Sequence, residues 1–90
     1  MGHPRFSGDE IVRRGLELYE NDIRTKLETE ENIGKMISID IETGDYGVDK
    51  DPIVAADLVF ARHPGAALFG AKIGYDAAFA LGGTVTRTGR

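Results

Sequence analysis

Apolar residues recur at steps of three and four in the first third of the chain. The stripe is formed by Val12, Leu16, Tyr19, Ile23 and Leu27. Such spacing places side chains on one face of an α-helix. Ser7 and Glu10 precede the stripe as in a capping box, in which the serine oxygen accepts a hydrogen bond from the Glu10 amide. The pattern predicts a helix from Gly8 to about Arg24, preceded by a flexible arm over residues 1–6.

Strict alternation replaces the helical spacing over residues 35–42. Isoleucines at 37, 39 and 41 fall on one side, and mainly polar residues fall on the other, which is the pattern of a half-buried β-strand. Thr43-Gly44-Asp45 is typical of a short turn, so residues 46–48 are expected to return as a second strand and complete a hairpin.

A second helix is expected after Asp51 and Pro52, because aspartate is a favoured N-cap and proline a favoured first helical residue. This helix carries Ile53, Val54, Leu58 and Phe60. Residues 66–73 are mostly apolar and predict a third strand. We expect a short helix over residues 76–81 and a marginal edge strand over residues 84–86.

These elements predict an α/β (α+β) domain over residues 7–84, in the order α-β-β-α-β-α, followed by a loose tail over residues 85–90. A right-handed crossover would place the third strand beside the first in a three-stranded mixed sheet, with the helices packed mainly on one face. The other sheet face would then be open. We therefore expect self-association or a protein partner, with four candidate contact residues: Leu16, Tyr19, Leu68 and Phe69.

Composition and charge narrow the classes of function. The 90 residues suit one domain, and the absence of cysteine excludes a disulfide framework, a Cys-ligated metal and a thiol nucleophile. Residues 1–57 carry 14 acidic against 7 basic residues, so nucleic acid is an unlikely partner. No apolar run approaches the roughly 18 residues of a membrane span, and the polar start does not resemble a signal peptide. We expect a cytoplasmic protein that has no membrane partner.

The strongest candidate for chemistry is Asp40-Ile41-Glu42 at the end of the first strand, which is similar to the first motif of the DEDD exonucleases. Two carboxylates on one strand can bridge divalent cations. The remaining acidic motifs of that family are missing, so a metal-dependent nuclease relic using Asp40 and Glu42 is the alternative rather than the main interpretation. The acidic turn over residues 40–51 departs from EF-hand spacing, and His63 is expected to cap a helix end. We expect no catalytic residue, no cofactor and no metal ligand.

Several stretches together resemble a family of small uncharacterised bacterial proteins, chiefly cyanobacterial, some of which are labelled antitoxin-like. The stretches are Gly34-Lys35, Asp40-Ile41-Glu42-Thr43-Gly44-Asp45-Tyr46, Ala61-Arg62-His63-Pro64, Ile73-Gly74-Tyr75 and Leu81-Gly82-Gly83. The resemblance covers about residues 8–84. It implies a compact bacterial cytoplasmic protein, the non-catalytic antitoxin-like or scaffolding half of a two-component system, and it supplies no catalytic residue. The main hypothesis is a protein-binding module, and a purely structural homo-oligomer is a further alternative.

Overall fold

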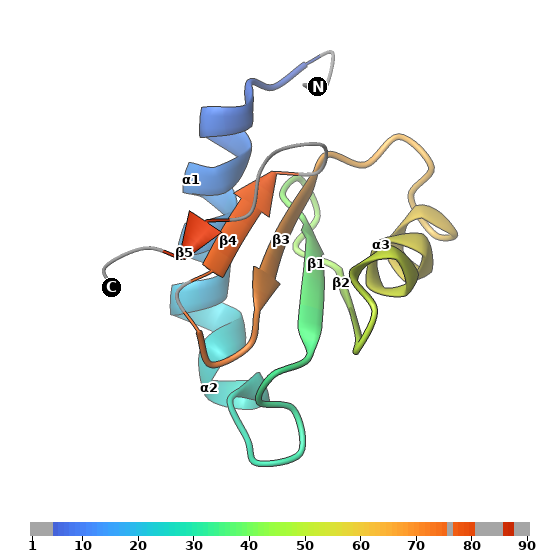
Figure 1. Ribbon diagram of the computed structural model, residues 1–90. Coiled ribbons are helices and arrows are strands. Elements are labelled where there is room, and N and C mark those ends of the chain that lie inside the picture. The colour runs from blue at the N-terminus through green and yellow to red at the C-terminus, as the bar shows by residue number, and fades with distance from the viewer. Residues whose placement is uncertain (1–4, 76, 81–85, 88–90) are drawn as a thin grey trace.

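The computed structural model describes residues 5–75, 77–80 and 86–87 of the chain. In chain order the elements are α1 (Gly8–Leu18), the π-helical turn η1 (Tyr19–Ile23), α2 (Arg24–Leu27), β1 (Met36–Asp40), β2 (Tyr46–Asp49), α3 (Pro52–Phe60), β3 (Leu68–Lys72), β4 (Ala77–Ala80) and β5 (Thr86–Arg87). Helices packed on an antiparallel sheet confirm the α+β class (Figure 1). The arm predicted over residues 1–6 and the tail over residues 85–90 lie mostly outside the described residues.

The sheet is larger than the sequence predicts, and its strands are not mixed in direction. Its order is β2-β1-β3-β4-β5, and every neighbouring pair is antiparallel. The β1–β2 hairpin and the position of β3 beside β1 were both expected and are confirmed, but β3 runs antiparallel to β1. The three-stranded mixed sheet was therefore wrong in both number and direction.

The predicted helix over residues 76–81 is also wrong, because Ala77–Ala80 form β4. Residues 76 and 81 lie outside the described part of the chain. Alanine favours helix in isolation, but here the segment pairs with β3, in the register Phe69↔Ala80, Gly70↔Phe79 and Ala71↔Ala78. Pairing with a neighbouring strand has outweighed a weak local preference.

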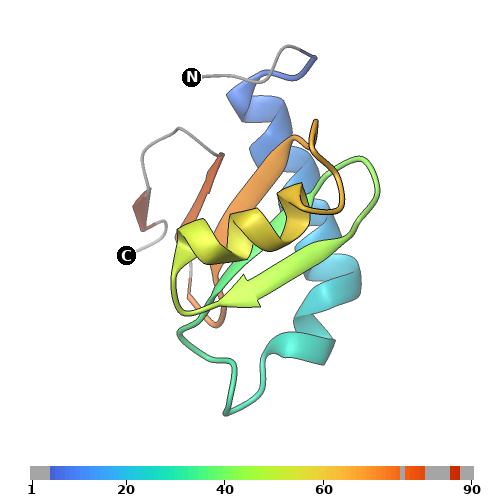
Figure 2. The ribbon, with the colours of Figure 1, turned by 90° about the vertical axis from the view of Figure 1, so that its right-hand side faces the viewer.

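The helices cover opposite faces of the sheet, contrary to the expectation of one shared face. Figure 1 shows α1 and α3 on either side of the strands, and in Figure 2 α3 lies in front of them with α1 behind. The alternation along β1 explains this arrangement. Ile37 and Ile39 belong to the core beneath α1, while Ser38 and Asp40 are also buried and point to the opposite face, over which α3 lies.

The buried face of the first helix is turned slightly from the predicted stripe. Ile11, Gly15, Tyr19 and Ile23 are buried, whereas Leu16 is exposed. Residues four apart drift by about 40° per step on an α-helix. The wider π-helical turn η1 counteracts this drift, so that Ile23 returns to the sheet. The expected capping box is half present, since Ser7 Oγ accepts from the Glu10 amide at 3.1 Å while the Glu10 carboxylate pairs with Arg14.

Two glycines allow the helices to approach the sheet closely. A Cβ on Gly15 would overlap Cβ and Cγ of Phe69, the fully buried ring at the centre of β3. On the other face, a Cβ on Gly47 of β2 would lie 2.6 Å from the Ala55 carbonyl oxygen of α3. Gly15 thus lets α1 pack closely against β3, and Gly47 lets α3 pack closely against β2, because neither glycine has a side chain at the contact.

Candidate functional site

The structure places the four predicted contact residues in different surroundings. Tyr19, Leu68 and Phe69 are 5%, 2% and 0% exposed, and all three belong to the core. Their strand β3 is flanked by β1 and β4 and is not an edge. These three side chains thus have almost no surface with which to meet a partner. Leu16, which is 39% exposed on α1, is the one that reaches the surface.

The carboxylates of Asp40 and Glu42 engage different partners. Asp40 is buried, and its carboxylate accepts hydrogen bonds from the Glu42 amide at 2.9 Å and the Thr43 hydroxyl at 3.0 Å. The Glu42 carboxylate binds Arg5 through both oxygens. In residues 5–75, 77–80 and 86–87 no group of three or more histidine or acidic side chains is placed to hold a metal ion. The Asp40 carboxylate instead fixes the turn between β1 and β2.

Asp45 links the same turn to the end of α3. Its Oδ2 accepts a hydrogen bond from Arg62 Nε at 2.7 Å and lies 3.1 Å from His63 Nε2. The hydrogen bond from Arg62 is the main cause that lowers the pKa of the Asp45 carboxyl, and the same contact raises the pKa of Arg62. The imidazole of His63 thus faces carboxylates, with Nδ1 3.9 Å from Asp40 Oδ2, where the sequence led us to expect a helix-end carbonyl.

The outer strand β2 is shielded by this group of side chains. The Tyr46 amide donates to Asp45 Oδ1 at 2.9 Å, and the Tyr46 carbonyl accepts from an Arg62 terminal nitrogen at 3.0 Å. A strand laid along this edge would find both backbone groups of Tyr46 already bound. Edge strands protected in this way resist pairing with other chains.

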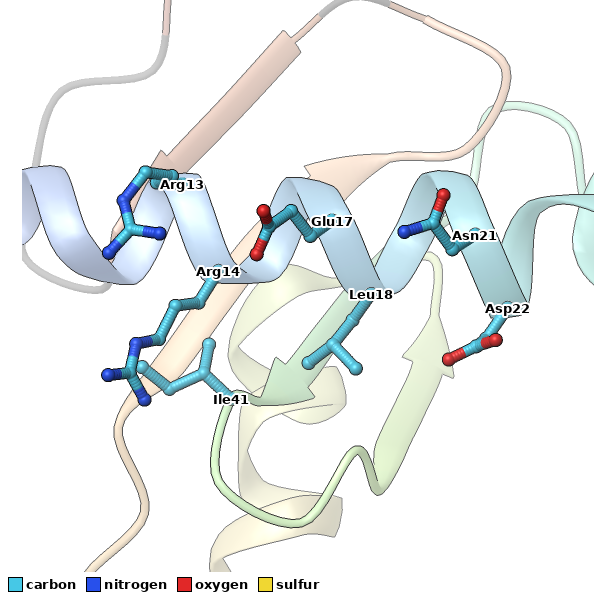
Figure 3. A pocket seen from close by; sticks show the side chains of 7 residues that line it. All are labelled: Arg13, Arg14, Glu17, Leu18, Asn21, Asp22 and Ile41. Atoms are coloured by element: carbon cyan, nitrogen blue, oxygen red, sulfur yellow. The ribbon is translucent and has the colours of Figure 1, made fainter.

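A shallow hollow of about 420 Å³ lies beside α1. Its lining residues are Arg13, Arg14, Glu17, Leu18, Asn21, Asp22 and Ile41. Figure 3 shows Leu18 and Ile41 forming its apolar side, while Arg13, Glu17 and Asn21 are spread along the helix and do not point to one centre. Arg14 is engaged by Glu10 and by the ring of Phe6. The hollow has no convergent set of polar groups of the kind that binds a small ligand.

The outward side of α3 is the most unusual surface on the described part of the chain. Ile53 is 67% exposed, and Val54 and Leu58 are each 41% exposed. We call these three residues the α3 patch. The opposite side of α3 is already buried through Ala55, Ala56 and Val59. A helix on a protein surface normally turns polar residues outward, whereas α3 is apolar on a side that the described part of the chain leaves uncovered.

Asp57 is the single charged residue of α3, is exposed, and lies beside the residues of the α3 patch. It follows Ile53 by four residues and Val54 by three, so the three side chains are neighbours on the helix surface. Its carbonyl oxygen accepts a hydrogen bond from the Ala61 amide, but no hydrogen bond or ion pair within residues 5–75, 77–80 and 86–87 engages its carboxylate. The patch is thus an apolar surface that surrounds one exposed acid.

The sequence contained a signal for this surface that the periodicity argument missed. Every residue of α3 except Asp57 is apolar or proline, so the helix lacks the polar face that one-sided packing requires. Reading Ile53, Val54 and Leu58 only as part of a helical pattern treated them as core residues. A sheet covers only one side of a helix, so a helix that is apolar all round must expose some of its apolar residues. This reasoning would have identified Ile53, Val54 and Leu58 as candidate surface residues.

Comparison with protein-family models, curated proteins and solved structures finds no match to this chain. Among the described residues, no helix combines the length and apolar character needed to cross a bilayer.

Proposed function

We propose that this chain is a non-catalytic protein-binding module that docks a second polypeptide on the α3 patch. The observation that carries the proposal is the exposure of Ile53, Val54 and Leu58 together on one helix. Removing apolar surface from water lowers the free energy by roughly 25 cal/mol per Å². Contiguous apolar surface on a folded chain is a common mark of a binding site.

The carboxylates that looked suited to chemistry support the same proposal. Asp40, Asp45 and Glu42 are each held by hydrogen bonds or ion pairs that organise the β1–β2 turn. Asp45 in this turn accepts a hydrogen bond from Arg62, which follows α3, and this contact fixes the end of the helix. In this proposal the acidic turn is a support that holds α3 in place, and the resemblance to antitoxin-like bacterial proteins favours a module that masks or scaffolds its partner in the cytoplasm.

Two leucines with nearly equal exposure provide a matched test. Leu58 is 41% exposed on α3, and Leu16 is 39% exposed on α1, across the sheet. Leu58→Ser, and independently Ile53→Ser, should reduce retention of the partner from an extract of the native host cells by about tenfold, as expected for central contact residues. Leu16→Ser should leave retention unchanged. The partner is then identified and its affinity measured by calorimetry.

The opposite pattern of retention would contradict the proposal. If Leu16→Ser releases the partner while Leu58→Ser and Ile53→Ser retain it, docking takes place on α1. If all three variants retain it equally, neither helix face is used. Thermal unfolding of each variant provides the control for folding, and Ile53→Ser should hardly change the melting temperature because most of this side chain already faces solvent.

A further inference from the structure

We infer that the occupant of the α3 patch is a basic amphipathic helix from another protein, one of whose lysine or arginine side chains pairs with Asp57. The inference rests on the proposed function and adds the chemistry of the partner. The patch supplies apolar contacts on both sides of a carboxylate, so the matching surface presents apolar residues on both sides of a cation.

The surroundings of Asp57 differ from those of the other aspartates in this region. Asp40 and Asp45 bind amides and side chains of the turn. Asp49 accepts from the Asp51 amide, and Asp51 caps α3 by accepting from the Ile53 amide at 2.8 Å. Among the five described aspartates over residues 40–57, only the Asp57 carboxylate has no such structural role.

Covering the α3 patch would remove water from the Asp57 carboxylate. A buried charge without a partner is strongly unfavourable, whereas a charge that meets an opposite charge and hydrogen-bond donors is tolerated. An apolar partner would therefore bury the patch at the cost of an unpaired carboxylate. A partner with a lysine or arginine at this position would satisfy it, and would discriminate against neutral and acidic competitors.

A second copy of this chain suits the patch poorly. In a two-fold contact the same patch meets itself, so two Asp57 carboxylates would enter one interface and repel each other. Strand addition beside α3 is also obstructed, since both backbone groups of Tyr46 on β2 are bound by Asp45 and Arg62. Leu58 follows Val54 by four residues and Ile53 by five, so apolar side chains are exposed on successive turns and suit a helix laid across them.

The test uses the full chain labelled with ¹⁵N and two synthetic peptides that form the same helix. One peptide has a leucine face bordered by lysines, and the other has glutamine in place of every lysine. The lysine peptide should shift the amide resonances of α3, and should bind about fivefold or more tightly than the glutamine peptide at low salt. In Asp57→Asn this preference should shrink to the small remainder that the chain's remaining net negative charge supplies.

The control variant is Asp22→Asn, which removes the same charge from an exposed position on the opposite side of the sheet. It should preserve the preference for the lysine peptide. If Asp22→Asn lowers that preference as much as Asp57→Asn, the lysine peptide recognises net charge alone and the inference is overturned.

Failure of the inference is distinguishable from failure of the proposed function. If both peptides shift the α3 resonances equally in the unchanged protein, α3 docks helices without regard to charge, so the function stands and the inference falls. If the unchanged protein forms a dimer that Ile53→Ser abolishes, the occupant of the α3 patch is a second copy of this chain. The proposed function then stands and the inference of a basic helix falls. If neither peptide shifts α3 resonances at millimolar concentration, the α3 patch is not a docking surface and both proposals fall.

Discussion

Replacing Gly15 by alanine sets two opposing effects against each other at the contact between α1 and β3. Alanine is favoured over glycine inside a helix by about 1 kcal/mol. The new Cβ would overlap Cβ and Cγ of Phe69 and lie 2.5 Å from its Cδ1. Those atoms are at the base of a fully buried ring on a strand paired on both sides, so they move only with the strand itself.

The overlap should outweigh the gain in helix propensity. Overpacking a dense core costs about 1 to 3 kcal/mol and sometimes more, and an overlap at the base of a side chain belongs at the upper end. After subtracting about 1 kcal/mol for propensity, Gly15→Ala should lower the free energy of unfolding by about 2 kcal/mol. For a chain of this size the melting temperature should fall by about 10 °C.

Gly8→Ala is the matched control, because Gly8 is in the same helix and no atom would lie within 4 Å of its new Cβ. This variant should be slightly more stable than the unchanged protein, by about 0.5 kcal/mol. Urea unfolding of both variants gives the two free energies. If Gly15→Ala is stabilising in the way that Gly8→Ala is, α1 does not lie against Phe69 as the structure has it, and the reasoning fails.

Further predictions concern the surface of α1 and the response to pH. Leu16→Ala should cost about 1 kcal/mol or less, whereas Ile23→Ala, at a position 4% exposed, should cost about 2 to 5 kcal/mol in urea unfolding. Burial first, and then the hydrogen bond to a glutamate, raise the pKa of Tyr19 from 10.0 to about 12. Its contribution to stability is therefore complete below pH 10 and is lost as pH rises towards 12, so Tyr19→Phe should flatten this alkaline decline in melting temperature. The pKa of Asp45 is lowered by Arg62, so its contribution is present above the ordinary carboxyl range and is lost as pH falls through the lowered pKa; Asp45→Asn should remove that acid-side slope.

The elements with local signals were predicted well. Ser7 begins α1 and Asp51 begins α3 because capping depends on residues within one turn. The alternation of isoleucines fixed β1 and its buried side. These features need only neighbouring residues, so the sequence expresses them directly.

The sheet order and the two-sided packing needed information from distant residues. Ala77–Ala80 became a strand through pairing with β3, and nothing within those four alanine-rich residues specifies it. The expectation of one covered face misplaced α3, and with it the surface carrying Ile53. The candidate contacts at Leu68 and Phe69 followed from the same error, because an apolar strand was taken for an exposed one when it lies at the centre of the sheet.

Concentrated proteins aggregate readily through sheet edges whose backbone N–H and C=O groups are unpaired. On β2, the amide and the carbonyl of Tyr46 are already held by Asp45 and Arg62. At Tyr46 the edge is therefore protected by the ion pair between Asp45 and Arg62. Salt weakens this protection, as it weakens any exposed pair of charges. Acid and concentrated salt weaken this pair, so we expect another strand to pair with β2 at Tyr46 more readily under those conditions than in dilute neutral solution.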